Sequence, residues 1–128
     1  MRSFAGETML PPQQTVALLN GTLSFRETGT GDPIVFLHGL NGNSGSWEKQ
    51  FEQLVDKFRI LAWDAPGYGQ SSLQDPDVDR YVEVAAEWLQ GRDAGQATVV
   101  GHSMGGVVAA RLAINHPQLV RRLVLSCS

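Results

Sequence analysis

Short, uninterrupted apolar runs mark the strands that this chain is expected to form. The run Ile34–Leu37 is wholly apolar, which is typical of a strand covered on both faces of a parallel sheet. It follows a break at 29–33 that is rich in Gly and ends in Pro. The same criterion predicts three further strands, at 59–63, 97–101 and 119–125.

Between these runs, apolar positions recur every three or four residues, which predicts helices. Trp47, Phe51 and Leu54 fall on one stripe of a helix that is expected to start near Ser44 or Ser46. Two more helices follow from the same spacing: one over 78–89, preceded by Asp75 or Asp77 and followed by Gly91, and one over 105–115, stopped by Pro117.

The alternation of strands and helices predicts the fold class. It is typical of an α/β fold, with a mostly parallel sheet, flanking helices and right-handed crossovers. Ahead of it, 16–19 and 23–28 are predicted to form a hairpin with Asn20-Gly21 as a type I′ turn. Residues 1–14 are expected to be a loosely ordered lead-in, and 15–128 a single domain.

Composition narrows the function classes. The chain has 128 residues, of which 42% are hydrophobic and 18% charged, as in globular proteins. Its formal charge of -3 gives no electrostatic reason to expect nucleic acid or an anionic membrane as partner. The single cysteine, Cys127, cannot form an internal disulfide, and we see no secretory signal and no apolar span of about 20 residues. We therefore expect a cytoplasmic protein.

A candidate nucleophile lies between the third of these strands and the helix that follows it. Gly101-His102-Ser103-Met104-Gly105 matches the Gly-x-Ser-x-Gly pattern of a nucleophile elbow. A serine hydroxyl is a weak nucleophile and has to be exposed at a sharp turn where a base can reach it. Gly101 and Gly105 leave room for the chain to approach itself closely at such a turn. The sequence therefore predicts Ser103 as the nucleophile.

The loop after Ile34–Leu37 is the candidate oxyanion hole. Acyl transfer develops negative charge on oxygen, which two preorganised backbone N–H groups can stabilise. We expect these N–H groups to be those of Leu40 and Met104. Gly39 and Asn41 remain alternatives to Leu40 as donor.

Three motifs, in this order and spacing, resemble the α/β-hydrolase superfamily: His38-Gly39, Asp64-x-Pro66-Gly67-x-Gly69-x-Ser71 and Gly101-His102-Ser103-Met104-Gly105-Gly106. They are most similar to its single-domain branch of small-molecule esterases, lactonases, carbon–carbon bond hydrolases and cofactor-free haloperoxidase-like enzymes. The resemblance implies a small-molecule carbonyl substrate, no cofactor, and His38 and Gly39 as support for the oxyanion loop. Serine at the elbow argues against haloalkane dehalogenases and epoxide hydrolases, which use aspartate there. Asp64 is interpreted as a turn stabiliser rather than a catalyst.

The rest of the family's triad is not apparent. The family order is Ser, then Asp or Glu, then His, yet 104–128 contains no acidic residue and one histidine, His116. His116 is expected at the far end of the elbow helix, on the order of 16 Å from Ser103. His102 belongs to the turn and His38 to the loop, so none of the three is a convincing base. We expect this chain to be nearly inactive alone.

The same comparison predicts a fold that is the N-terminal part of the family's domain and incomplete at the C-terminus. The strand at Arg122–Ser126 would then expose an edge through which two copies could associate. Widely separated histidines and one cysteine indicate no metal site. The rival hypothesis is a non-catalytic binding or assembly module that keeps the elbow as a scaffold.

Overall fold

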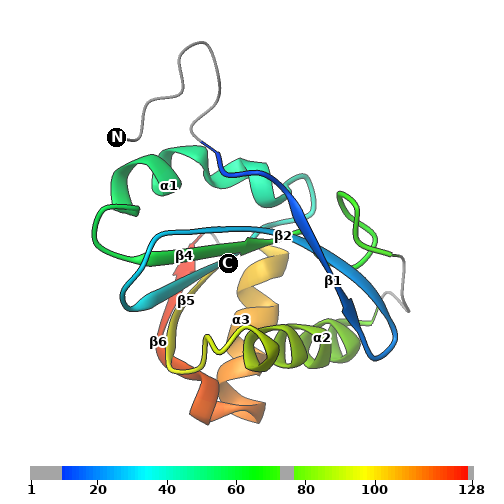
Figure 1. Ribbon diagram of the computed structural model, residues 1–128. Helices are drawn as coiled ribbons and strands as arrows, with labels where there is room; N and C mark the ends of the chain where they lie inside the picture. The colour runs from blue at the N-terminus through cyan, green and yellow to red at the C-terminus, as the bar shows by residue number, and fades with distance from the viewer. Residues whose placement is uncertain (1–9, 73–76, 127–128) are drawn as a thin grey trace.

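A six-stranded sheet forms the centre of the molecule. The computed structural model describes residues 10–72 and 77–126, and in it the strands lie in the order β1-β2-β4-β3-β5-β6. The pairs β3·β4, β3·β5 and β5·β6 are parallel, whereas β1·β2 and β2·β4 are antiparallel. Helix α1 covers one face, and α2 and α3 cover the other (Figure 1). The predicted α/β class with a mostly parallel sheet is confirmed.

The strands are β1 (Gln14–Leu18), β2 (Gly21–Thr28), β3 (Pro33–Leu37), β4 (Arg59–Trp63), β5 (Ala97–His102) and β6 (Val120–Ser126). The helices are α1 (Glu48–Leu54), α2 (Val78–Gly91) and α3 (Met104–Asn115), and two short 3-10 helices are η1 (Ser44–Trp47) and η2 (Pro117–Leu119). The predicted elements are all present. Gly91, expected beyond the second helix, is instead its last residue.

The hairpin of β1 and β2 is present, but the predicted turn was wrong. Leu18 pairs with Gly21, so the two central residues are Leu19 and Asn20. Neither has a positive φ, whereas a type I′ turn needs a positive φ at both; only Gly21 does, at 153°. Asn20-Gly21 was therefore placed one residue too far along, because Gly21 already belongs to the second strand. Of the expected lead-in 1–14, residues 1–9 lie outside the described part.

The face of the sheet under α1 is covered by the apolar stripe that its spacing predicted. Phe51 is buried against Phe36, Ile60 and Ala62 of the sheet, and the Phe36 and Trp47 rings lie 4.7 Å apart. Asn43 begins this segment, because its side chain accepts a hydrogen bond from the Gly45 N–H in a capping box with Ser46. The capping explains why the helical segment starts directly after the loop at 38–42.

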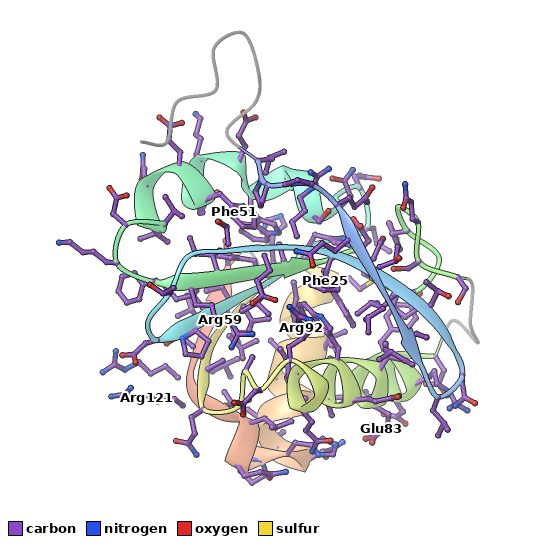
Figure 2. All side chains as sticks on the ribbon, viewed as in Figure 1. Phe25, Phe51, Arg59, Glu83, Arg92 and Arg121 are labelled. Atoms are coloured by element: carbon purple, nitrogen blue, oxygen red, sulfur yellow. The ribbon has the colours of Figure 1, made fainter. Side chains whose placement is uncertain are left out.

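The opposite face holds the larger core, with α2 and α3 packed on β3, β4 and β5. Trp63 and Trp88 stack in it with ring centroids 6.1 Å apart. At its rim, Glu27 on β2 accepts hydrogen bonds from Arg59 at 2.7 Å and Arg92 at 3.0 Å, and both arginines are labelled in Figure 2. This cluster of ion pairs joins β2, β4 and the end of α2. Arg59 begins β4, so the cluster lies at the amino end of the parallel strands, whereas Ser103 follows the carboxyl end of β5.

Strand β6 is an edge of the described sheet. It pairs with β5, and no other described strand pairs with it. Leu123, Val124 and Leu125 are 39%, 46% and 49% exposed, whereas the apolar residues of β3 and β5 are largely covered. In 10–72 and 77–126, no helix has the length and apolar character to cross a membrane.

Candidate active site

Ser103 occupies a sharp bend between β5 and α3. Its backbone has φ 55° and ψ -116°, a positive-φ conformation that residues other than glycine rarely adopt. Its N–H donates to the Ser126 carbonyl at 3.2 Å, and its own carbonyl accepts the Gly106 N–H at 2.8 Å. The side chain is exposed. The bend thus presents the hydroxyl to solvent at the carboxyl end of the parallel strands.

The elbow closes tightly enough that only glycine fits beside Ser103. A Cβ at Gly105 would lie 2.7 Å from the His38 carbonyl oxygen, and the Leu37 carbonyl is nearer still. A Cβ at Gly101 would lie 2.7 Å from the Gly106 Cα. Real Cβ contacts under 3.0 Å essentially never occur. The predicted elbow glycines are therefore required by the approach of α3 to the ends of β3 and β5.

Parallel pairing brings the loop after β3 next to the elbow. Leu37 pairs with Gly101 in register, so each strand's next residues leave the sheet side by side. A Cβ at Gly39 would lie 3.1 Å from the Ser103 Cβ and 3.2 Å from the His102 ring. The tertiary structure thus brings Gly39 and Ser103 together, although they are 64 positions apart in the sequence.

The orientation of the Gly39–Leu40 peptide follows from two hydrogen bonds to one carbonyl. The Gly39 oxygen accepts from the His38 ring at Nδ1, 2.7 Å away, and from the Gly42 N–H, 3.0 Å away. Carbonyl and N–H point in opposite directions across a trans peptide. The Leu40 N–H is therefore directed away from the His38 ring. Met104 is the first residue of α3, so its N–H is among those without a partner inside the helix.

His38 has a defined tautomer. The Ala65 N–H donates to Nε2 at 3.0 Å, so Nε2 is the acceptor and Nδ1 carries the proton that goes to the Gly39 oxygen. Burial lowers the pKa of His38 below its ordinary value; the Gly39 carbonyl and the Asp64 charge oppose this only in part. Both ring nitrogens are occupied and the ring is buried. His38 consequently supports the loop and cannot serve as a base for Ser103.

The other two histidines are also engaged elsewhere. His102 Nδ1 lies 3.4 Å from the Ser126 hydroxyl. His116 is the C-terminal capping residue of α3, as expected, and its Nε2 lies 3.0 Å from Glu83 on α2. These are all the histidines of the chain. None of them hydrogen-bonds to Ser103, so the 128 residues hold no histidine that is positioned as its base.

Asp64 is fully buried at the end of β4, where the Ser44 hydroxyl contacts it and three further groups donate hydrogen bonds to it. They are the Ser44 N–H at 2.7 Å, the Ser24 hydroxyl at 2.6 Å and the Gln13 amide at 2.6 Å. Burial raises the pKa of Asp64, but these hydrogen bonds together outweigh it and hold the pKa below its ordinary value. The carboxylate is therefore charged and fully occupied as an acceptor, which agrees with its interpretation as a structural residue.

The glycine at position 69 lets the following turn wrap around that carboxylate. Gly69 has φ 54°, and a Cβ there would lie 2.6 Å from an Asp64 oxygen. The Ser71 hydroxyl donates to the Asp64 carbonyl at 2.6 Å, which closes the turn. The motif from 64 to 71 is thus a turn built around a buried carboxylate. Sequence reasoning missed its remote partners Gln13, Ser24 and Ser44, since no local pattern links them to Asp64.

A cleft of about 370 Å³ opens beside the loop and the elbow. His102 and Gly39, which contact the Ser103 position, are part of its lining. On the α1 side its wall includes Trp47 and Gln50. Sequence reasoning assigned Trp47 to the core and passed over Gln50. Gln50 could have been noticed in the sequence because it lies on the first turn of the helix after the loop and outside the apolar stripe.

Among the described residues, no cluster of three or more potential metal ligands is present.

Comparison with known proteins settles the family. The family model for the alpha/beta hydrolase fold matches residues 32–128. This chain belongs to the α/β-hydrolase family. It is 40% identical over 108 residues to a pimeloyl-[acyl-carrier protein] methyl ester esterase of Nitrosomonas europaea, covering 84% of this chain and 41% of the relative. It is 30% identical over 108 residues to an (E)-2-((N-methylformamido)methylene)succinate hydrolase of Acinetobacter baylyi, covering 83% and 41%.

A solved structure shows the same relationship within the α/β-hydrolase family. The crystal structure of an E-2-(acetamidomethylene)succinate hydrolase superposes with a TM-score of 0.83 at 31% identity, covering 88% of this chain and 42% of that one. These relatives are hydrolases or esterases. The chain spans less than half the length of the relatives that it matches.

Proposed function

We propose that this chain carries the nucleophile and the oxyanion hole of a serine hydrolase that acts on a small ester, lactone or related carbonyl compound. The observation that carries the proposal is the exposed Ser103 on a left-handed backbone, with Gly39 against it. The names of the hydrolase and esterase relatives support the same reaction class. A cleft of about 370 Å³ lies beside this bend; Gly39 and His102, the neighbours of Ser103, are part of its lining, although Ser103 itself is not.

The reaction follows the usual course of acyl transfer. The Ser103 oxygen forms a bond to the carbonyl carbon as its proton passes to a base, and the carbonyl oxygen becomes an oxyanion near the Leu40 and Met104 N–H groups. Collapse breaks the bond to the leaving alcohol, which takes up a proton. Water then hydrolyses the acyl-serine. We assign the base to a residue outside these 128, because all three histidines have other partners.

The test measures acylation of the chain itself. With p-nitrophenyl acetate we expect a slow burst of at most one p-nitrophenolate per chain and an acetyl group on the peptide that contains Ser103, found by mass spectrometry. Ser103→Ala should abolish both. Thr15→Ala, which removes an exposed hydroxyl from β1 at the other edge of the sheet, should change neither. Equal acylation of the wild type and Ser103→Ala would refute the proposal and favour the non-catalytic binding module. Fast turnover would refute the assignment of the base to a residue outside these 128.

A further inference from the structure

The loop of the proposed oxyanion hole is held at both ends by Asp64 and Ala65, the two residues that directly follow β4. At its start, the Ala65 N–H binds Nε2 of His38, whose Nδ1 in turn binds the Gly39 carbonyl. At its end, Asp64 accepts the Ser44 N–H at 2.7 Å. Residues 38 and 44 are thus both bound to the dipeptide Asp64-Ala65, and Leu40 lies in the chain between these two contacts.

The Asp64 carboxylate is itself held from several directions. Ser24 on β2 and Gln13 before β1 donate to it, and the turn at Gly69 closes around it. Ser24 and Gln13 come from parts of the chain that are distant in sequence from Asp64, and the carboxylate is fully buried. Its position is therefore fixed by the fold and not by the loop that it binds.

We propose that Asp64 is a positioning residue for the oxyanion loop, an assignment that rests on Leu40 serving as a donor in the proposed function. Asp64 does not touch the substrate. It holds Ser44 directly and, through its own backbone, places the Ala65 N–H that fixes His38 and hence the Gly39–Leu40 peptide. Its effect on the reaction is exerted on the orientation of one N–H group.

Hydrogen exchange tests the loop without any reaction at Ser103. The Gly42 N–H donates to the same Gly39 carbonyl as His38 does, so its exchange reports loosening of the loop. General destabilisation also speeds exchange in the core, so the measured quantity is the ratio of Gly42 exchange to that of Leu89 inside α2. We expect Asp64→Ala to raise this ratio tenfold or more. Glu27→Gln, which weakens another multiply bonded carboxylate far from the loop, should leave the ratio unchanged.

A second pair of variants covers the case in which Asp64→Ala does not fold. Ser44 is the first residue of η1 and follows Asn43, whose backbone is extended, so the backbone there is compatible with proline. Both substitutions remove the hydroxyl, which accepts from Arg26 at 3.1 Å and also contacts Asp64, but only Ser44→Pro removes the N–H that Asp64 accepts. We expect Ser44→Pro to raise the exchange ratio well above the value for Ser44→Ala, because the two variants differ in the N–H and both lack the hydroxyl.

The acylation rate of Ser103 is the second readout. Loss of one oxyanion donor costs about 10²–10³-fold in established cases, so we expect Asp64→Ala to slow acylation at least tenfold with little change in the half-saturating ester concentration. Asp64→Asn keeps an acceptor oxygen for Ser44 and should restore part of the rate. An unchanged exchange ratio in both Asp64→Ala and Ser44→Pro, or an equal rise in Glu27→Gln, overturns the proposal. Failure of wild-type acylation would count against the proposed function alone.

Discussion

The backbone of Ser103 predicts an unusual effect of glycine on stability. At φ 55° and ψ -116° any residue with a Cβ is strained, and such strain costs about 1–3 kcal/mol. Glycine lacks the Cβ and populates positive φ without that cost. Ser103→Gly should therefore remove strain that Ser103→Ala retains, so the two variants differ in backbone strain while both lose the hydroxyl.

The expected size of the difference follows from two opposing terms. Glycine relieves about 1–3 kcal/mol of strain but adds freedom to the unfolded chain worth about 0.4–1 kcal/mol. Ser103→Gly should thus exceed Ser103→Ala in free energy of unfolding by about 1 kcal/mol. The matched control is Ala113→Gly inside α3, where φ is negative and the same exchange should cost about 0.5–1 kcal/mol.

Urea denaturation followed by tryptophan fluorescence measures both comparisons, since Trp63 and Trp88 are buried in the core. The sign of the Ala-to-Gly change should reverse between positions 103 and 113. If glycine destabilises at both positions by similar amounts, the elbow stores no strain. The fold would then not force the Ser103 hydroxyl into its exposed position.

Three further predictions follow from the same geometry. Gly105→Ala should lower the free energy of unfolding by about 3 kcal/mol, because α3 must move away from the Leu37 and His38 carbonyls. Gly91→Ala is the control: no atom lies within 4 Å of its added Cβ, so it should be neutral or stabilising, and equal effects of the two substitutions would contradict the prediction. Because burial lowers the pKa of His38, its contribution to stability should be complete above its ordinary pKa of 6.5 and be lost as the pH drops below it. His38→Gln should therefore make the fall in stability just below pH 6.5 shallower in pH-dependent denaturation, and an unchanged slope would contradict this. The open edge of β6 should make the chain self-associate on size-exclusion chromatography, and Val124→Lys should return it to a monomer; a monomeric wild type would contradict this.

Local pattern was sufficient for most of the fold and for the elbow that carries Ser103. A strand buried on both faces has to be apolar throughout, so Ile34–Leu37 identified β3 directly, and the spacing of Trp47 and Phe51 identified the helical segment after it. The glycines around Ser103 mark the elbow because a close backbone approach excludes any side chain, a requirement that acts within five residues of sequence.

The hairpin turn shows where local pattern fails. Asn20-Gly21 has the composition of a type I′ turn, but the register of β1 and β2 placed Gly21 in the strand and Leu19 in the turn. Register is decided by which side chains the two strands bury against α2 and the core, and this information lies outside the turn.

By itself, the sequence determined the fold class, the elbow and the loop that accompanies it, because each depends on neighbours along the chain. Only the tertiary structure decided what His38 and Asp64 do. The tautomer of His38 depends on the Ala65 N–H, and the charge of Asp64 depends on donors at Gln13, Ser24 and Ser44. The protonation and orientation of a buried polar group are set by whichever distant groups the fold brings into hydrogen-bond distance, and no local spacing encodes those partners.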